Sequence, residues 1–455
     1  MADIAPLTPL RYDLSRLSGG LGAVVAPPYD VIGPDERAAL AARNPHNVVR
    51  LIVPEGEGDA RYANAAALLG DWRRSGALLR DSEPAFYRYD QTFVPPGSDG
   101  AAGASPARGL RAITRRGFLA LVRVVPFSER IVLPHERTLS GPKEDRLKLF
   151  RATETNLSPG FMLYRDPRGQ LDSPLETGHV VTEFSTADGV HHVLAKVTAP
   201  DAVRAIAEGI ERSTLLIADG HHRYETALAY SREVDAAHPN ASARAEHRYF
   251  MTFLVNGDDP NLVVFPTHRF VHSLPSFSFD DLLTHANKTF IVRALDRGVD
   301  AAGVAAGLRD AGASGPSVAV ASGDGRVALL TVRGDVDLAT HPTLGHRPEV
   351  LRTTDITILH AGILEHLLGI TPEAQAAKTN LWYPQDTRAA LAQLRGGGPT
   401  AGQLLFVMNP TPVDDVRRVA EAGEVMPQKS TFFYPKVLTG LAIHTLEPSR
   451  EVASI

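Results

Sequence analysis

The densest group of side chains able to do chemistry is one run of five residues: Asp219, Gly220, His221, His222 and Arg223. It follows a short apolar run and opens a stretch with helical spacing, so we expect a strand, a glycine turn and a helix in succession. A helix N-terminus attracts anions, and the guanidinium adds donors suited to phosphate. The aspartate would repel phosphate but can hold a divalent cation that bridges phosphate oxygens. The run predicts a metal–phosphate site; the alternative is an aspartate N-cap followed by solvent-exposed histidines.

A glutamate that could act as a base lies in the segment Pro134-His135-Glu136. Glu136 comes soon after the apolar run at residues 131–133, where a carboxylate can be held at the edge of a sheet and accept a proton. An ordinary loop with solvated charges is the alternative for this segment.

Two further segments carry cationic and hydroxyl donors. Lys429, Ser430 and Thr431 offer an ammonium and two hydroxyls in succession, which could form a phosphate cradle, although the spacing is not that of a Walker loop. His268 and Arg269 follow an apolar, strand-like run closely. The alternatives are a loop without a ligand and a turn at the end of a strand.

The composition excludes several classes of protein. The chain has 455 residues, of which 44% are hydrophobic and 22% charged, the balance of a globular protein of two or three domains. Its 47 Lys and Arg against 52 Asp and Glu give a net charge of −5, which disfavours non-specific nucleic-acid binding. It contains no cysteine, so disulfides, cysteine-ligated metals and thiol chemistry are excluded.

The sequence shows no targeting signal and no membrane span. The N-terminal residues lack a basic region followed by an apolar stretch, and no run of about 18 apolar residues occurs. We therefore expect a cytoplasmic protein that has no membrane partner.

Strand-like and helical patterns are mixed along the chain. Apolar runs predict strands at residues 48–53, 117–125, 215–218, 249–255 and 404–409. Helical spacing predicts helices at residues 34–43, 60–75, 200–212, 221–230, 355–368 and 413–422. This mixture predicts an α+β fold.

Motifs spread over nearly the whole chain resemble a large bacterial family known as domain of unknown function ten-fifteen. They are APPYDVI at residues 26–32, LPHERT at 133–138, PKEDRL at 142–147, NLSPGFMLY at 156–164, IADGHHRYETAL at 217–228 and FPTHRF at 265–270. That family name by itself implies no activity.

Three segments are also similar, in the same order, to the archaeal free serine kinases, which phosphorylate L-serine to O-phosphoserine. They are Pro134 to Glu136, Asp219 to Arg223, and Gly423 to Thr431. Those kinases belong to the ParB/sulfiredoxin-like fold group, whose members bind nucleotide phosphates at the start of a helix. The resemblance implies a ParB/sulfiredoxin-like core with an N-terminal and an inserted extra α/β segment.

From this resemblance we expect four parts of the chain. They are an N-terminal α/β segment at residues 1–110, the core at 111–270, an inserted α/β region at 271–400, and a C-terminal segment at 401–455 that returns to the active site.

The resemblance also implies roles for individual residues. Glu136, Asp219 and His222 would be catalytic, with Glu136 as the base and Asp219 as the metal ligand. The phosphate or nucleotide site would be formed by Gly220, His221, Arg223, Arg269, Lys429, Ser430 and Thr431. The amino-acid substrate would contact His135, His222 and His268.

We therefore expect a metal-dependent small-molecule kinase that phosphorylates the hydroxyl of a free amino acid, with L-serine as the expected acceptor. Mg²⁺ or another divalent cation would be the cofactor, and ATP, ADP or pyrophosphate the donor. The alternatives are a ParB-like nucleotide-binding switch or DNA-associated protein, and a non-catalytic sensor of amino acids or phosphate. The sulfiredoxin activity of the same fold group is excluded, because it needs a cysteine.

Overall fold

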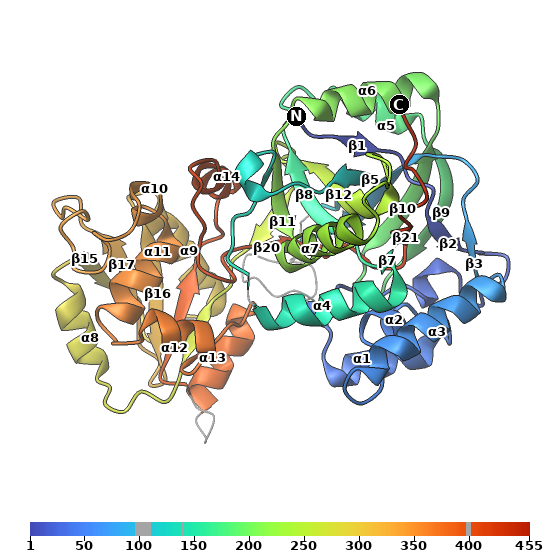
Figure 1. The fold of residues 1–455 in the computed structure, drawn as a ribbon. Helices are drawn as coiled ribbons and strands as arrows, with labels where there is room; N and C mark the ends of the chain where they lie inside the picture. Colours follow the sequence, from blue (N-terminus) through green and yellow to red (C-terminus); the bar gives the residue numbers. More distant parts are fainter. Residues whose placement is uncertain (96–110, 139, 397–401) are drawn as a thin grey trace.

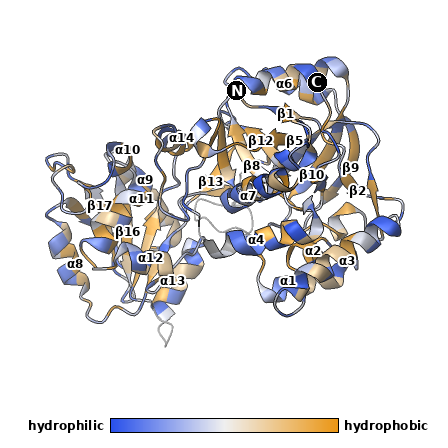
Figure 2. Ribbon diagram, viewed as in Figure 1, coloured by the Kyte–Doolittle hydropathy of each residue, from blue (hydrophilic) through white to orange (hydrophobic). Residues whose placement is uncertain are grey.

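The computed structural model describes residues 1–95, 111–138, 140–396 and 402–455. They form two lobes, each built on one large sheet, with α14 (Val413–Glu421) lying between them (Figure 1). Helices and strands are mixed in both lobes, which confirms the predicted α+β fold. Hydrophobic strands fill the inside of each lobe, and hydrophilic residues follow the outer sides of the helices (Figure 2).

The first lobe is built on a nine-stranded sheet in the order β6-β11-β8-β12-β5-β4-β10-β9, with β1 pairing with β5. The strands are β1 (Ile4–Ala5), β4 (Phe86–Phe93), β5 (Ile113–Arg123), β6 (Val132–Leu133), β8 (Gly160–Tyr164), β9 (His179–Ser185), β10 (His191–Val197), β11 (Leu215–Asp219) and β12 (Tyr249–Asn256). β12 is antiparallel to β5 and parallel to β8, so the sheet is mixed. Its central strands are buried on both faces, which explains their nearly continuous apolar sequences.

Helices cover both faces of this sheet. Those of the first lobe are α1 (Pro34–Arg43), α2 (Val49–Ile52), α3 (Ala60–Arg74), α4 (Ser140–Thr153), α5 (Asp172–Glu176), α6 (Pro200–Glu211) and α7 (His221–Ala237), with short 3-10 turns η1 (Leu21–Ala23), η2 (Tyr29–Val31), η3 (Phe127–Glu129) and η4 (Glu246–Arg248). Ile206 of α6 and Tyr224 of α7 pack with Phe118 and Phe250 on one face. The apolar side chains of α2 and α3 join the cluster on the other face.

One expected strand is a helix. Residues 48–53 carry an apolar run that predicts a strand, but α2 forms there instead. A short apolar run does not distinguish a buried strand from a buried helix. Asn47 decides between them, because its Oδ1 accepts the N–H of Val49 at 3.0 Å and its Nδ2 donates to the carbonyl of Ala23 at 2.9 Å.

The second lobe is built on a six-stranded antiparallel sheet in the order β15-β17-β16-β19-β14-β18. The strands are β14 (Arg269–Val271), β15 (Phe290–Ala294), β16 (Ser317–Ser322), β17 (Val327–Val332), β18 (Leu381–Trp382) and β19 (Leu404–Met408). The helices are α8 (Phe279–Ala286), α9 (Ala301–Gly312), α10 (Glu349–Arg352), α11 (Asp355–Thr357), the π-helix η5 (Ile358–Glu365), α12 (Pro372–Ala377) and α13 (Thr387–Gly396). The expected domain boundaries stay a prediction, and the one at residue 110 adjoins a stretch outside the described residues.

The C-terminal segment returns from α14 to the first lobe. There β20 (Phe432–Tyr434) pairs with β13 (Val263–Phe265), and β21 (His444–Thr445) pairs with β7 (Thr155–Asn156). A third small pair joins β2 (Leu10–Tyr12) to β3 (Leu78–Arg80). This return brings residues 427–436 to the C-terminal end of β11.

Within the described residues, no helix has the length and apolar character needed to cross a membrane.

Candidate functional site

The turn between β11 and α7 has the geometry that the sequence predicts. β11 ends at Asp219, Gly220 has a φ of 92°, and α7 begins at His221. This backbone conformation favours glycine, and a Cβ at residue 220 would lie 2.9 Å from Nε of Arg223 and displace its guanidinium. In the described part of the chain no side chain caps α7, and His221 is buried. The alternative of an aspartate N-cap followed by exposed histidines is therefore wrong.

Asp219 is paired with two cationic side chains. Its Oδ2 accepts a hydrogen bond from Nζ of Lys436 at 2.9 Å, and its Oδ1 lies 3.4 Å from Nη2 of Arg223. Burial alone would raise the pKa of Asp219, but Lys436 and Arg223 hold it below its usual range. The carboxylate therefore stays ionised, with a cation at each oxygen.

The surroundings of Asp219 do not fit a resident divalent cation. Such a cation needs several oxygen ligands, whereas the two oxygens of Asp219 face positive charges. No group of three or more His, Asp or Glu side chains that could hold a metal ion occurs among the described residues. We therefore derive no step from a metal at Asp219, and the predicted Mg²⁺ stays a prediction.

His135 and His221 form a buried pair of imidazoles beside the turn, with ring centres 4.6 Å apart. Nδ1 of His135 donates to the carbonyl of Ile217 at 2.6 Å, and its Nε2 accepts the hydroxyl of Thr431 at 2.9 Å. The backbone N–H of His135 donates to Nε2 of His221 at 3.2 Å. Burial lowers the pKa of both histidines, so both are neutral near pH 7. His135 thus joins β11 to the C-terminal segment, and its predicted contact with the amino-acid substrate stays a prediction.

Glu136 reaches the third predicted segment. Its Oε1 accepts the N–H of Ser430 at 3.0 Å, and residue 136 forms a parallel β-bridge with Met426. The Glu136 side chain is 18% exposed. Its Oε2 has no hydrogen-bond partner among the residues that the structure describes. One oxygen therefore holds the loop, and the other is not engaged by the described residues.

The loop at residues 427–431 is also held from the second lobe, by Arg269. Nη2 of Arg269 donates to the carbonyls of Gln428 and Lys429, both at 3.2 Å, and its Nε donates to His360 at 3.0 Å. Arg269 is fully buried, and burial lowers its pKa to about 10. Lys429 has a φ of 59° and an exposed side chain. The sequence predicts that Arg269 binds phosphate, whereas the structure shows its donors engaged by the loop backbone and by His360.

His268 belongs to the framework of the second lobe. Its Nδ1 accepts the N–H of Met408 at 3.2 Å, and its Nε2 donates to the hydroxyl of Thr387 at 2.8 Å. Burial lowers its pKa to about 3. The structure thus engages both ring nitrogens within the lobe, and the predicted contact with the substrate stays a prediction.

His222 lies in the first turn of α7 and is partly buried. Burial lowers its pKa, which Glu225, Asp30 and Glu136 raise in turn. The structure therefore places His222 among charged groups from three segments, including the proposed base.

Lys436 is the residue that sequence reasoning missed. It follows Pro435 at the end of the stretch that contains Lys429 to Thr431, and its Nζ lies 4.3 Å from the ring centre of Phe432. A lone lysine after a proline is no signal in a sequence. Only the return of the C-terminal segment to β11 brings it to Asp219.

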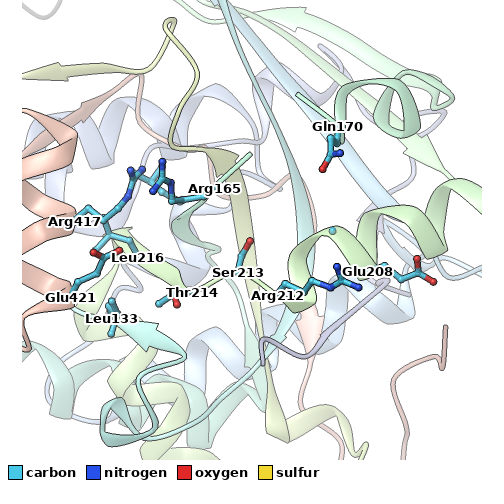
Figure 3. A pocket seen from close by; sticks show the side chains of 12 residues that line it. Leu133, Arg165, Gln170, Glu208, Arg212, Ser213, Thr214, Leu216, Arg417 and Glu421 are labelled. Atoms are coloured by element: carbon cyan, nitrogen blue, oxygen red, sulfur yellow. The ribbon is translucent and has the colours of Figure 1, made fainter. Parts of the chain in front are cut away.

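A hollow of about 450 Å³ lies at the other end of β11 (Figure 3). It is lined by residues of β6, β8 and α14 and by Ser213 and Thr214, which lead into β11. Arg165 and Arg417 both approach Oδ1 of Asp258 there, at 3.5 and 3.7 Å. None of the residues that line the hollow belongs to the charged cluster of Glu136, Asp219, Arg223 and Lys436. The hollow and this cluster are therefore separate.

The structure defines an α+β protein in which a half-buried charged cluster, formed by Glu136, Asp219, Arg223 and Lys436, is assembled from three distant segments. A comparison with protein families matches residues 4–356 to the family described as "Protein of unknown function (DUF1015)". The chain belongs to this family, as its motifs predict. The matched range includes Glu136 and Asp219 and ends before the loop at residues 427–431.

Several solved structures are similar to this chain. A free serine kinase mutant in complex with ADP is 10% identical, with 70% of this chain and 89% of that one covered and a TM-score of 0.35. A conserved hypothetical protein from Pyrococcus furiosus is 12% identical, with 68% and 89% covered and a TM-score of 0.33. SbnI with a C-terminal truncation, from Staphylococcus aureus, is 10% identical, with 70% and 85% covered and a TM-score of 0.33. No curated protein matches the chain. Similarities at this level carry no argument about activity.

Proposed function

We propose that this protein is a phosphotransferase that moves a phosphoryl group to the hydroxyl of a free amino acid, with L-serine as the expected acceptor. The observation that supports this most is the 3.0 Å hydrogen bond from the N–H of Ser430 to Oε1 of Glu136. It joins the expected base to the loop expected to hold the phosphates of the donor.

The charges of the cluster suit a transferring phosphoryl group. Phosphoryl transfer requires positioning and the stabilisation of negative charge more than covalent participation by the protein. The N–H groups in the first turn of α7, the Arg223 guanidinium and the Lys436 ammonium supply positive potential. Asp219 holds both cationic side chains at the turn, where a phosphate group can compete for them.

In the proposed step, the phosphoryl group moves from the donor to the acceptor hydroxyl. The acceptor hydroxyl oxygen forms a bond to phosphorus while the bond from phosphorus to the bridging oxygen of the donor breaks. The hydroxyl proton goes to Oε2 of Glu136, because Oε1 is engaged by Ser430. The leaving group keeps the electron pair of the broken bond, and Arg223 and Lys436 stabilise its negative charge.

Purified protein incubated with L-serine and with ATP, ADP or pyrophosphate, each with and without Mg²⁺, tests the proposal. We expect O-phosphoserine, detected by mass spectrometry, with at least one donor. Glu136→Gln can still accept the N–H of Ser430 through its amide oxygen but cannot take up a proton. Its kcat should fall by about a hundredfold or more, while the Kd of the donor changes by less than about twofold.

Glu144→Gln is the matched control, since Glu144 is exposed on α4, and it should keep the kcat of the unchanged protein. Normal turnover by Glu136→Gln would refute the assignment of the base. The absence of phosphoserine with every donor would refute the amino-acid acceptor. Donor binding without transfer would favour the ParB-like switch instead.

A further inference from the structure

Arg115 is an arginine buried inside the first lobe. It lies on β5, is 0% exposed, and places its guanidinium 4.9 and 5.6 Å from the ring centres of Phe161 and Phe253. Its Nη2 donates to the carbonyl of Pro435 at 2.5 Å and to Oε1 of Gln91. The side chain therefore connects the centre of the sheet to the C-terminal segment.

Gln91 lies directly opposite Arg115 on the neighbouring strand β4. Its Nε2 donates to the carbonyl of Lys436 at 3.1 Å. This cross-strand pair thus holds two successive carbonyls, those of Pro435 and Lys436. Because Nζ of Lys436 donates to Asp219 at 2.9 Å, the backbone is fixed at the residue whose side chain enters the site.

Two nitrogens of the Arg115 guanidinium have no hydrogen-bond partner among the described residues. They are Nε and Nη1, and both are buried. A buried cation with unused donors destabilises a fold, whereas an apolar side chain beside the two aromatic rings would not. The stability of the core therefore does not explain an arginine here. Its donations to the carbonyl of Pro435 and to Gln91 are the contacts that an apolar residue could not make.

We propose that Arg115 is a positioning residue that, together with Gln91, fixes the backbone at Lys436 and so keeps the Lys436 ammonium on Asp219. The effect of Arg115 on turnover rests on the proposed function, but its effect on the position of the Lys436 side chain does not. Without these contacts, the ammonium would leave Asp219 for solvent part of the time.

Arg115→Met tests the proposal, with Arg116→Met as the matched control. Arg116 is the next residue on β5, and on the opposite face it pairs with its own cross-strand partner Asp90 at 3.2 Å. Both variants remove a guanidinium from the same strand, but only the first removes the donor to Pro435.

Acetylation by acetic anhydride, followed peptide by peptide with mass spectrometry, reports on Lys436 without any need for turnover. Asp219 holds Nζ of Lys436 at 2.9 Å in a side chain that is only 18% exposed, so the amine reaches the reagent mainly when it leaves this contact for solvent. Because release from Asp219 exposes the amine, the rate at Lys436, relative to the exposed Lys288, should rise about tenfold in Arg115→Met. It should stay within about twofold of the unchanged protein in Arg116→Met.

In the serine assay, the kcat of Arg115→Met should fall about tenfold while the KM for serine stays within about twofold. Arg115→Lys keeps one donor for Pro435 and should recover part of the loss. If Arg115→Met does not fold, Gln91→Leu and Arg115→Lys carry the same test by acetylation. Unchanged acetylation of Lys436 would overturn the proposal. A further outcome is that Lys436 is acetylated faster in Arg115→Met, while the protein without substitutions makes no phosphoserine. This outcome would support the positioning role and overturn only the proposed function.

Discussion

The loop at residues 427–431 is held from its two sides by opposite kinds of groups. From the first lobe, the Glu136 carboxylate accepts a loop N–H and the His135 imidazole accepts a loop hydroxyl. From the second lobe, the Arg269 guanidinium donates to two loop carbonyls. The same short segment is therefore a meeting point of the two lobes.

The groups that hold the loop from the two lobes differ in how many of their hydrogen-bonding atoms are engaged. Glu136 keeps one oxygen without a partner among the described residues, whereas all three nitrogens of Arg269 are bonded, including Nη1 to the carbonyl of Thr267. A fully engaged group can only fix geometry, whereas a carboxylate oxygen that the described residues leave unpaired can also accept a proton. We infer that the first lobe carries the chemistry and the second lobe shapes the loop.

The variant Arg269→Met removes the hydrogen bonds from the second lobe to the loop at residues 427–431, and it has the largest expected effect on stability. It leaves the buried acceptors on His360 and Thr267 without a donor, at a cost of about 1–3 kcal/mol for each such group, and also frees the partly buried carbonyls of the loop. The free energy of unfolding in urea should fall by about 3 kcal/mol or more, and the KM of the donor should rise about tenfold. Glu136→Gln should instead leave the free energy of unfolding within about 1 kcal/mol. Equal losses of stability in both variants would contradict the division of roles.

The free energy of unfolding, measured as a function of pH, tests whether His268 is part of the framework of the second lobe. The pKa of His268 falls from 6.5 to about 3 on folding, because the ring is buried. Since the folded-state pKa is depressed, the stabilising contribution is complete above about pH 6.5 and is lost as the pH falls towards 3. Between these values this group should lower the free energy of unfolding by about 1.4 kcal/mol per pH unit.

His268→Gln tests this, since glutamine can still accept the N–H of Met408 and donate to Thr387. Urea unfolding between pH 6 and pH 4 should show a slope smaller by about one proton than that of the unchanged protein. A slope that the substitution leaves unaltered would show that His268 does not stay neutral in the fold.

The smallest effect is expected at the hollow beyond the start of β11. Arg417→Met removes a cation that lines it, but the hollow is separate from the cluster at Asp219. The kcat and the KM of the donor should both stay within about twofold of the unchanged protein. A tenfold loss of kcat would show that the hollow belongs to the working site.

The sequence predicts those features that depend on neighbouring residues. The apolar run, the glycine and the helical spacing of β11 and α7 lie within one short stretch, and the structure has the strand, turn and helix in that order. The apolar run at α2 predicts a strand wrongly, because the hydrogen bonds of Asn47 to the separate segment at Ala23 decide its conformation.

The roles of individual cations could not be predicted in this way. Lys436, Arg269 and Arg115 take their parts from contacts with segments far away in the chain. A sequence shows that a guanidinium is present but not whether its donors face a ligand or a backbone carbonyl. For Arg269 the structure shows the backbone carbonyls.

We propose that three distant segments form one phosphate site at the start of α7, and a crystal structure with ADP bound tests this arrangement. We expect the β-phosphate at the first turn of α7, within hydrogen-bond distance of Arg223 or Lys436 and beside the loop at residues 427–431. Phosphate density between Arg165 and Arg417, at the other end of β11, would contradict it.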